Sequence, residues 1–100
     1  MFRSIHVLSG ETLFERAPQP YADFAHDLTE LRCRQSRFAA LPVNRRAALL
    51  LELADKLARE RDTLAQMVCR EVGRCLRECQ AELDKSVDLI RYYAHLSPEL

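Results

Sequence analysis

The tetrapeptide Glu71-Val72-Gly73-Arg74 separates two stretches of helical apolar periodicity and decides how the chain is expected to fold. On both sides of it, apolar residues recur at spacings close to multiples of 3.6 residues. Glycine takes the left-handed conformation at a helix C-terminus without strain. Gly73 is therefore predicted to end one helix, and a second helix is predicted to follow it.

The helical pattern extends far in both directions from this turn. Upstream, one helix is predicted over about 43–70, with an apolar stripe formed by Leu50, Leu53, Ala54, Leu57, Leu64 and Val68. At about 1.5 Å per residue, this helix would reach about 40 Å. Downstream, a helix over about 76–96 is predicted to end at Ser97-Pro98. Its inward-facing residues are predicted to be Leu83, Val87, Ile90 and Ala94.

The first forty residues complete a mainly α fold, with an N-terminal β-hairpin followed by three amphipathic helices. Residues 4–16 are β-prone around the turn Ser9-Gly10-Glu11, and two prolines mark a linker after them. A helix is predicted over about 22–39, ended by Pro42, with Phe24, Leu28, Leu31 and Phe38 on one face. Leu41 is expected to be a poor N-cap for the next helix, because serine or threonine is preferred there.

Composition limits the classes of partner. A chain of 100 residues with 48% hydrophobic content is one domain or part of one, with a radius of gyration of about 13 Å if it folds alone. Fifteen basic residues balance fifteen acidic ones, so no net charge draws the chain to nucleic acid or to a membrane. No apolar run approaches a bilayer span, and no export signal is recognised, so the chain is expected to be cytoplasmic with four free thiols.

The apolar faces are broader than three helices and a hairpin conceal. The residues outside the main stripes are Leu49, Leu51, Met67, Ile90, Tyr92 and Tyr93. Exposed apolar surface of this extent indicates contact with another structure. The expected partner is the remainder of a larger fold or a second copy of the chain.

Neither a metal site nor a catalytic residue is predicted. Cys69, Cys75 and Cys79 lack the short Cys-x2-Cys spacing of zinc sites, so core packing is favoured for them. The basic cluster could contact phosphate, but solvated helix surface or salt bridging is favoured; its members are Arg32, Arg34, Arg37, Arg45 and Arg46. The histidines have no paired acid or nucleophile at helical spacing and are not predicted to be general bases; they are His6, His26 and His95.

The order of these elements resembles the opening of the aldehyde dehydrogenase superfamily. Glu71-Val72-Gly73-Arg74 is similar to the family's Glu-Met-Gly-Lys turn, and Ser9-Gly10-Glu11 resembles its Thr-Gly-Glu hairpin turn. Arg46-Ala47 and Leu53-Ala54-Asp55 resemble its second-helix pattern, and Ala81-Glu82-Leu83-Asp84-Lys85-Ser86 is similar to bacterial succinate-semialdehyde dehydrogenases. The chain departs from the family where His6-Val7-Leu8 replaces Asn-Pro-Ala and where Cys75 replaces a proline.

The resemblance implies a Rossmann-like α/β enzyme that oxidises an aldehyde to a carboxylate. In the family, a cysteine forms a thiohemiacetal, hydride passes to NAD or NADP, and a glutamate assists thioester hydrolysis. In the family, these parts lie downstream of the matched segment. Neither the four cysteines nor Gly10 and Gly73, the only glycines, match the family's catalytic loop or phosphate-binding turn. The first hypothesis is that 1–100 is the non-catalytic N-terminal segment of such an enzyme and binds no cofactor alone. The alternative is a stand-alone helical protein or truncated gene product that associates through its apolar helix faces.

Overall fold

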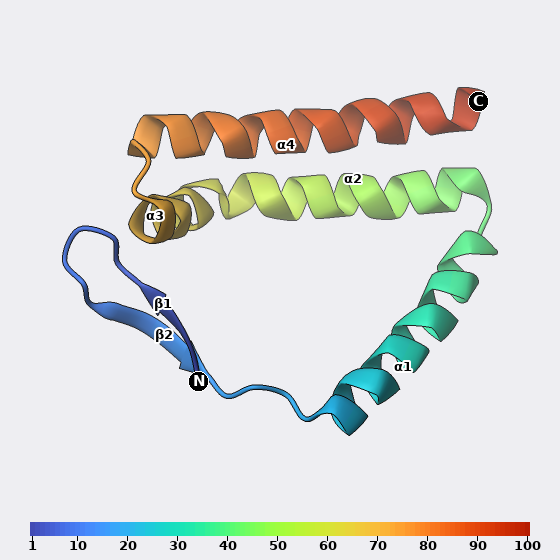
Figure 1. The fold of residues 1–100 in the computed structure, drawn as a ribbon. Coiled ribbons are helices and arrows are strands. Elements are labelled where there is room, and N and C mark those ends of the chain that lie inside the picture. The colour runs from blue at the N-terminus through green and yellow to red at the C-terminus, as the bar shows by residue number, and fades with distance from the viewer.

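Two antiparallel helices form the centre of the fold. In the computed structural model, which describes all residues 1–100, α2 (Val43–Arg59) and α4 (Leu76–Leu96) lie side by side (Figure 1). All the buried side chains on this pair are short, namely Ala47, Ala54, Cys79, Val87 and Ala94. Small side chains let two helix backbones approach closely, so the pair is held by close packing of short residues.

The prediction of one helix over 43–70 is wrong. The helix ends at Arg59, and a separate helix, α3 (Arg61–Val72), begins after Glu60 at φ −92° and ψ 7°. In Figure 1, α3 is seen nearly end-on, while α2 lies across the view and is seen from the side. The change of direction buries Ala65 completely and packs α3 against α4. Tertiary packing therefore breaks a helix whose sequence periodicity is continuous.

The turn at Gly73 is confirmed. Gly73 has φ +78°, and its N–H donates to the carbonyl of Cys69 at 2.9 Å. The helix that follows has the predicted bounds and continues into η1 (Ser97–Glu99), a short 3-10 turn. The inward face of α4 is also confirmed: Val87 and Ala94 are buried, and Leu83 and Ile90 are half-buried.

The N-terminal hairpin is confirmed, although it begins two residues earlier than predicted. Its strands are β1 (Phe2–Ile5) and β2 (Thr12–Arg16), antiparallel with Phe2 opposite Arg16. The turn contains Gly10 at φ +75°. The sequence did not predict the role of His6, whose Nδ1 accepts the N–H groups of Leu8 and Ser9, both at 3.2 Å.

Helix α1 (Tyr21–Ala39) has almost the predicted bounds but a different environment. None of its residues is buried, so the apolar face predicted for this helix is left uncovered within this chain. The exposed fractions of Phe24, Leu28, Leu31 and Phe38 are 48%, 50%, 60% and 39%. The reason is that α1 diverges from the α2–α4 pair and makes almost no contact with other elements (Figure 1).

The corner between α1 and α2 is formed by Pro42. This residue, and not Leu41, is the N-cap of α2, because its carbonyl accepts the N–H groups of Arg45 and Arg46 at 3.0 and 3.1 Å. No side chain caps the helix at this point. The expected poor cap is therefore present, but one residue later than predicted.

The whole chain is more extended than a self-contained domain of its length. Its radius of gyration is 17.5 Å, against about 13 Å expected for 100 compact residues. The hairpin and α1 project from the same side of the helical layer as two separate arms (Figure 1), and the extents are 48 × 40 × 18 Å. No helix combines the length and the apolar character that a bilayer span requires.

Candidate functional site

Polar contacts attach the hairpin to the C-terminal end of α3, next to the connection to α4. The Ser4 hydroxyl donates to the carboxylate of Glu71, and the Val7 N–H donates to the carbonyl of Arg70 at 3.1 Å. A Cβ on Gly73 would lie 2.7 Å from a methyl carbon of Val7. Glycine is therefore required at position 73 for two reasons: its φ is positive, and the hairpin approaches too closely to leave room for a Cβ.

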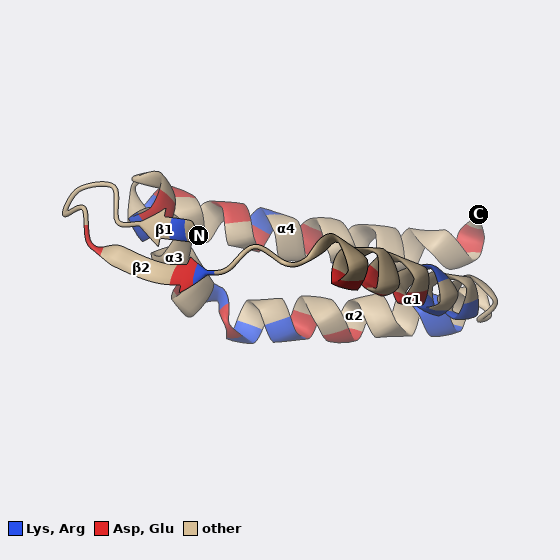
Figure 2. Cartoon of the chain, turned by 60° about the horizontal axis from the view of Figure 1, so that its bottom comes forward, with Lys and Arg blue, Asp and Glu red and all other residues tan.

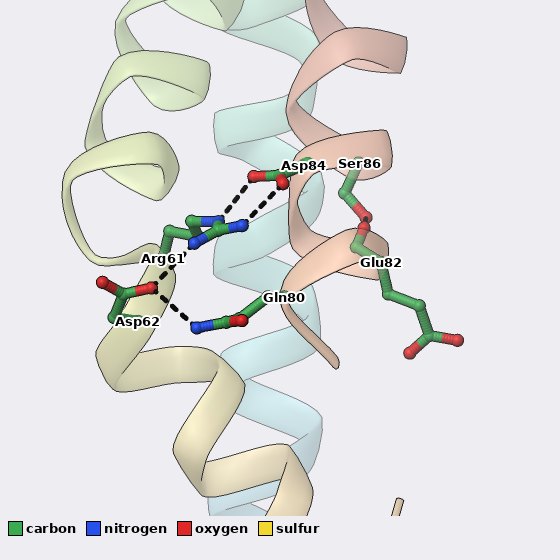
Figure 3. A network of polar contacts seen from close by, with 6 residues as sticks. All are labelled: Arg61, Asp62, Gln80, Glu82, Asp84 and Ser86. Atoms are coloured by element: carbon green, nitrogen blue, oxygen red, sulfur yellow. Dashed lines mark hydrogen bonds and ion pairs between the residues drawn. The ribbon is translucent and has the colours of Figure 1, made fainter. Parts of the chain in front are cut away.

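Arg61 forms the strongest link between α3 and α4. Its guanidinium donates two hydrogen bonds to the Asp84 carboxylate, at 2.7 and 2.8 Å, and one to Asp62 at 2.9 Å (Figure 3). Gln80 extends the network by donating to Asp62 at 3.3 Å. The hydrogen bonds from Arg61 lower the pKa of Asp84, and those to Asp84 raise the pKa of Arg61. Two parallel bonds fix orientation as well as distance.

Three further ion pairs lie in the same layer. Arg74 pairs with Glu82, whose hydrogen bond raises the pKa of Arg74, and lies 3.6 Å from Glu78. Arg91 on α4 donates to Asp55 on α2 at 2.9 Å. All these side chains are partly exposed to solvent, so each pair orients the helices more than it stabilises them.

Cys79 is the only buried thiol, and its surroundings disfavour the thiolate. Its thiol donates to the Arg74 carbonyl at 3.9 Å, and burial raises its pKa. The thiolate is the nucleophilic form of cysteine, so a raised pKa opposes nucleophilic attack. Core packing is confirmed for Cys79 but wrong for Cys75, which is exposed because it lies at the N-cap of α4, before the helical periodicity begins.

The other candidates from the sequence do not converge on one site. No three His, Cys, Asp or Glu side chains are placed to share a metal ion. The basic cluster divides between α1 and the start of α2. Within it, Arg34 pairs with Glu30 at 2.6 Å, while the Nε of Arg46 is buried without a hydrogen-bond partner.

The aromatic pair and the largest apolar hollow lie on the surface. Tyr92 and Tyr93 meet edge to face with ring centroids 5.2 Å apart, and both are exposed. A hollow of about 410 Å³ opens between β2 and α3; its lining residues are Leu13, Phe14, Met67, Arg70 and Glu71. Neither place combines a nucleophile with a base. The polar groups at the junction act instead to fix the hairpin and α3 against α4.

Comparison with known proteins identifies the family of this chain. Residues 2–100 match the aldehyde dehydrogenase family. The chain belongs to that family. It is 28% identical, over 97% of its length, to a succinate-semialdehyde dehydrogenase [NADP(+)] of Deinococcus radiodurans. It is 26% identical, over 99% of its length, to a (Z)-2-((N-methylformamido)methylene)-5-hydroxybutyrolactone dehydrogenase of Acinetobacter baylyi.

The chain spans about a fifth of the length of these aldehyde dehydrogenase relatives. The resemblance drawn from the Glu71–Arg74 turn and from the run Ala81–Ser86 is therefore confirmed at the level of the family. The residues of that turn and of that run lie at the junction of α3 and α4, where Gly73, Arg74, Glu82 and Asp84 make the contacts described above.

The pairing of Arg61 with Asp84 was not predicted, although Asp84 belongs to the run Ala81–Ser86 that resembles the family. The signal that could have revealed this pair is the position of oppositely charged residues on two helical segments that run antiparallel. Arg61 pairs with Asp84, and Asp55, six residues before Arg61, pairs with Arg91, seven residues after Asp84. The order of the partners is therefore reversed between the two segments. A basic residue opposite an acidic one at matched positions is the expected sign of two antiparallel helices in contact.

Proposed function

We propose that this chain is the opening segment of an NAD(P)-dependent aldehyde dehydrogenase of the succinate-semialdehyde type, in which it has a structural role. The observation that carries this proposal is the state of α1, none of whose residues is buried. A helix with one continuous apolar face and no cover is suited to pack on a larger body. The family match over residues 2–100 supports the same interpretation, because the chain spans only about a fifth of its relatives.

The reaction of the complete enzyme would be oxidation of a short semialdehyde to a carboxylate. The Deinococcus radiodurans relative bears succinate semialdehyde and NADP(+) in its name, and NAD or NADP is the cofactor class of this proposal. That chemistry needs a reactive thiolate and a glycine-lined cradle for the cofactor phosphates. In residues 1–100, burial raises the pKa of Cys79, and the two glycines form a hairpin turn and a helix cap. The segment therefore supports the fold and does not carry the reaction.

The proposed structural role rests on specific contacts between the elements. The ion pair of Arg61 with Asp84 fixes α3 on α4, Arg74 pairs with Glu82 and so holds the connection before α4 to that helix, and the hairpin is attached to α3 through Glu71 and Arg70. This leaves α1 and the outer faces of α2 and α4 available to flank a Rossmann-like cofactor-binding domain. Balanced charge and four free cysteines suit a cytoplasmic protein with no nucleic-acid or membrane partner.

An activity assay tests the non-catalytic part of the proposal. The purified 100-residue chain is expected to give no NADP⁺ or NAD⁺ reduction above the blank with succinate semialdehyde. The four single Cys→Ser variants serve as controls for any residual signal. Turnover by the chain that is lost in one of these variants contradicts the structural role.

A chimera tests the structural part. In it, these 100 residues replace the matched fifth of the Deinococcus radiodurans enzyme, and amide hydrogen exchange is measured in α1. The expected result is strong protection of α1 in the chimera and weak protection in the isolated chain, because a packed face protects its helix. A chimera whose remaining domains fold while α1 still exchanges as it does in the isolated chain contradicts the proposal.

A second candidate function follows from the same exposed faces. The chain is then a non-catalytic helical protein that associates through apolar surface, which includes Leu89, Tyr92 and Tyr93 on α4 at 53%, 60% and 53% exposure. Self-association of the 100-residue chain, with no activity in the assay above, favours this candidate. A monomer whose α1 becomes protected only in the chimera favours the first.

A further inference from the structure

Arg46 is the only residue of the chain with a buried side-chain nitrogen or oxygen that has no hydrogen-bond partner. The buried atom is its Nε, and no carboxylate of the chain forms an ion pair with its guanidinium. A buried donor that lacks an acceptor destabilises a fold, so folded proteins rarely leave one unpaired. The unpaired guanidinium therefore marks a position where the 100-residue chain lacks an acceptor.

Arg46 lines a hollow at the corner between α1 and α2. The hollow has a volume of about 200 Å³ and is also bordered by η1; its lining residues are Phe38, Val43, Arg46, Ala47, Leu50 and Ser97. The Ser97 hydroxyl already donates its proton to the carbonyl of Tyr93 at 2.6 Å, so Arg46 is the only lining side chain with a proton free for a ligand. The other lining side chains are apolar. A ligand that fits this hollow combines an acceptor group with an apolar stem.

The chain around this hollow has a positive charge and no acidic residue. Residues 31–51 include no Asp or Glu but contain the whole basic cluster of the sequence, Arg32, Arg34, Arg37, Arg45 and Arg46. Figure 2 shows Lys and Arg towards the end of α1 and at the start of α2. The first turn of α2 has no acidic residue, and its N-cap forms no side-chain hydrogen bond, although the N-terminal end of a helix favours negative charge. Both the arginines and the helix dipole therefore favour an anion at this corner.

The shape of the guanidinium and the small number of donors favour a carboxylate over a phosphate. A carboxylate has two oxygens in a plane, and a guanidinium binds them through two parallel hydrogen bonds. A phosphate group has three acceptor oxygens and a charge of about −1.5 to −2 near neutral pH, but the hollow supplies one cation and no hydroxyl proton. Glu99 of η1 does not fill this role, since it lines a different hollow with Tyr92 and His95.

We propose that Arg46 binds the carboxylate of an Asp or Glu side chain from the remainder of the enzyme fold. The apolar stem of that side chain lies against Phe38 and Leu50, which line the hollow. Phe38 also belongs to the apolar face of α1, so a body that covers this face reaches Arg46 as well. The source of the carboxylate rests on the proposed function, whereas the affinity of the hollow for a carboxylate is a property of the 100-residue chain.

An NMR titration of the 100-residue chain with sodium butyrate tests the chemistry of the hollow. Ionic strength is held constant with sodium chloride, because salt screens charge interactions. Butyrate is expected to shift the amide signals of residues 43–50 and of Ser97, with saturation in the millimolar range. The neutral alcohol 1-butanol, which has the same carbon chain, is expected to cause no such saturable shift. Arg46→Met is expected to abolish the shift, whereas Arg45→Met, which removes an exposed arginine from the same helical turn, is the matched control and is expected to keep it.

The chimera described above tests the source of the carboxylate. There, Arg46→Met is expected to speed amide exchange of residues 43–50 about tenfold or more, because it removes a charged hydrogen bond from a covered site. In the isolated chain, the same variant is expected to leave this exchange unchanged or to slow it, because methionine has no donor to leave unpaired. Arg45→Met is expected to have the same effect in both proteins. A difference that is confined to Arg46 assigns the acceptor to the remainder of the enzyme.

Three results overturn the proposal, and they separate it from the proposed function. A butyrate shift that is absent, or that survives Arg46→Met, shows that the hollow is not a carboxylate site. Equal effects of Arg46→Met in the chimera and in the isolated chain, with α1 protected in the chimera, show that the remainder of the enzyme covers α1 but supplies no carboxylate to Arg46. An unprotected α1 in the chimera overturns the proposed function, and with it the source of the carboxylate, even if butyrate binds the isolated chain.

Discussion

Helices α2 and α1 have similar lengths, and each has a periodic apolar face, but only the face of α2 is covered by another helix of the chain. α2 packs along α4 and buries Ala47 and Ala54, whereas α1 buries nothing. The periodicity of a helix therefore shows which side chains share a face but not what covers that face. It follows that α2, α3, α4 and the hairpin form a connected unit, to which α1 is joined by a corner and a linker.

The largest expected effect comes from a comparison of the same alanine-to-leucine substitution in each of the two helices. Ala54, with no exposed surface, has no room for a larger side chain, so Ala54→Leu is expected to destabilise the chain by about 2–3 kcal/mol through overpacking. Ala22→Leu on α1, at an exposed position, is expected to change stability by less than about 0.5 kcal/mol. Urea unfolding measures both. Equal destabilisation by the two variants would show that α1 is packed as closely as α2.

The next effect concerns the attachment of the hairpin to the helical unit. Gly73→Ala is expected to cost about 1–2 kcal/mol, because alanine at positive φ is strained and its Cβ would lie 2.7 Å from Val7. Gly10→Ala is the matched control, since Gly10 has φ +75° and no atom near its missing Cβ. The excess cost at Gly73, measured by thermal unfolding, isolates the hairpin contact. If Gly73→Ala stabilises the chain, the turn is absent.

The smallest effect depends on pH and on the pair that joins α3 to α4. The hydrogen bonds from Arg61 lower the pKa of Asp84 in the folded chain. A depressed folded pKa stabilises the fold above the unfolded pKa, near pH 4, and this contribution is lost as the pH falls through the folded value. Asp84→Asn is therefore expected to reduce the loss of thermal stability below about pH 4. A variant with the same acid profile as the parent chain would show that the pair contributes nothing measurable to stability.

Local rules predicted most elements of the fold. The hairpin turn at Gly10, the cap at Gly73 and the bounds of α4 each depend on one residue type or one periodic pattern, which is visible in the sequence. The break at Glu60 was not predictable, because no proline or glycine lies there and the apolar spacing continues through it. It arises from the packing of Ala65 and Arg61 against α4, which is a contact between distant parts of the chain.

The functional part was predictable only at the level of the family. The run Ala81–Ser86 and the turn Glu71–Arg74 indicated the aldehyde dehydrogenases, and the family match confirms this. The pairing of Arg61 with Asp84 and the exposure of Cys75 were not predicted, since both depend on how α3 meets α4. Residues that mark a family do not by themselves show which of them touch.

Amide hydrogen exchange across the 100-residue chain decides whether α1 is held by the rest of the chain. At a concentration where the chain is monomeric, amides of α1 are expected to exchange much faster than those of α2 and α4, because a helix without buried contacts opens locally at little cost. Protection of α1 equal to that of α4 in the monomer would contradict the separation of α1 from the helical unit.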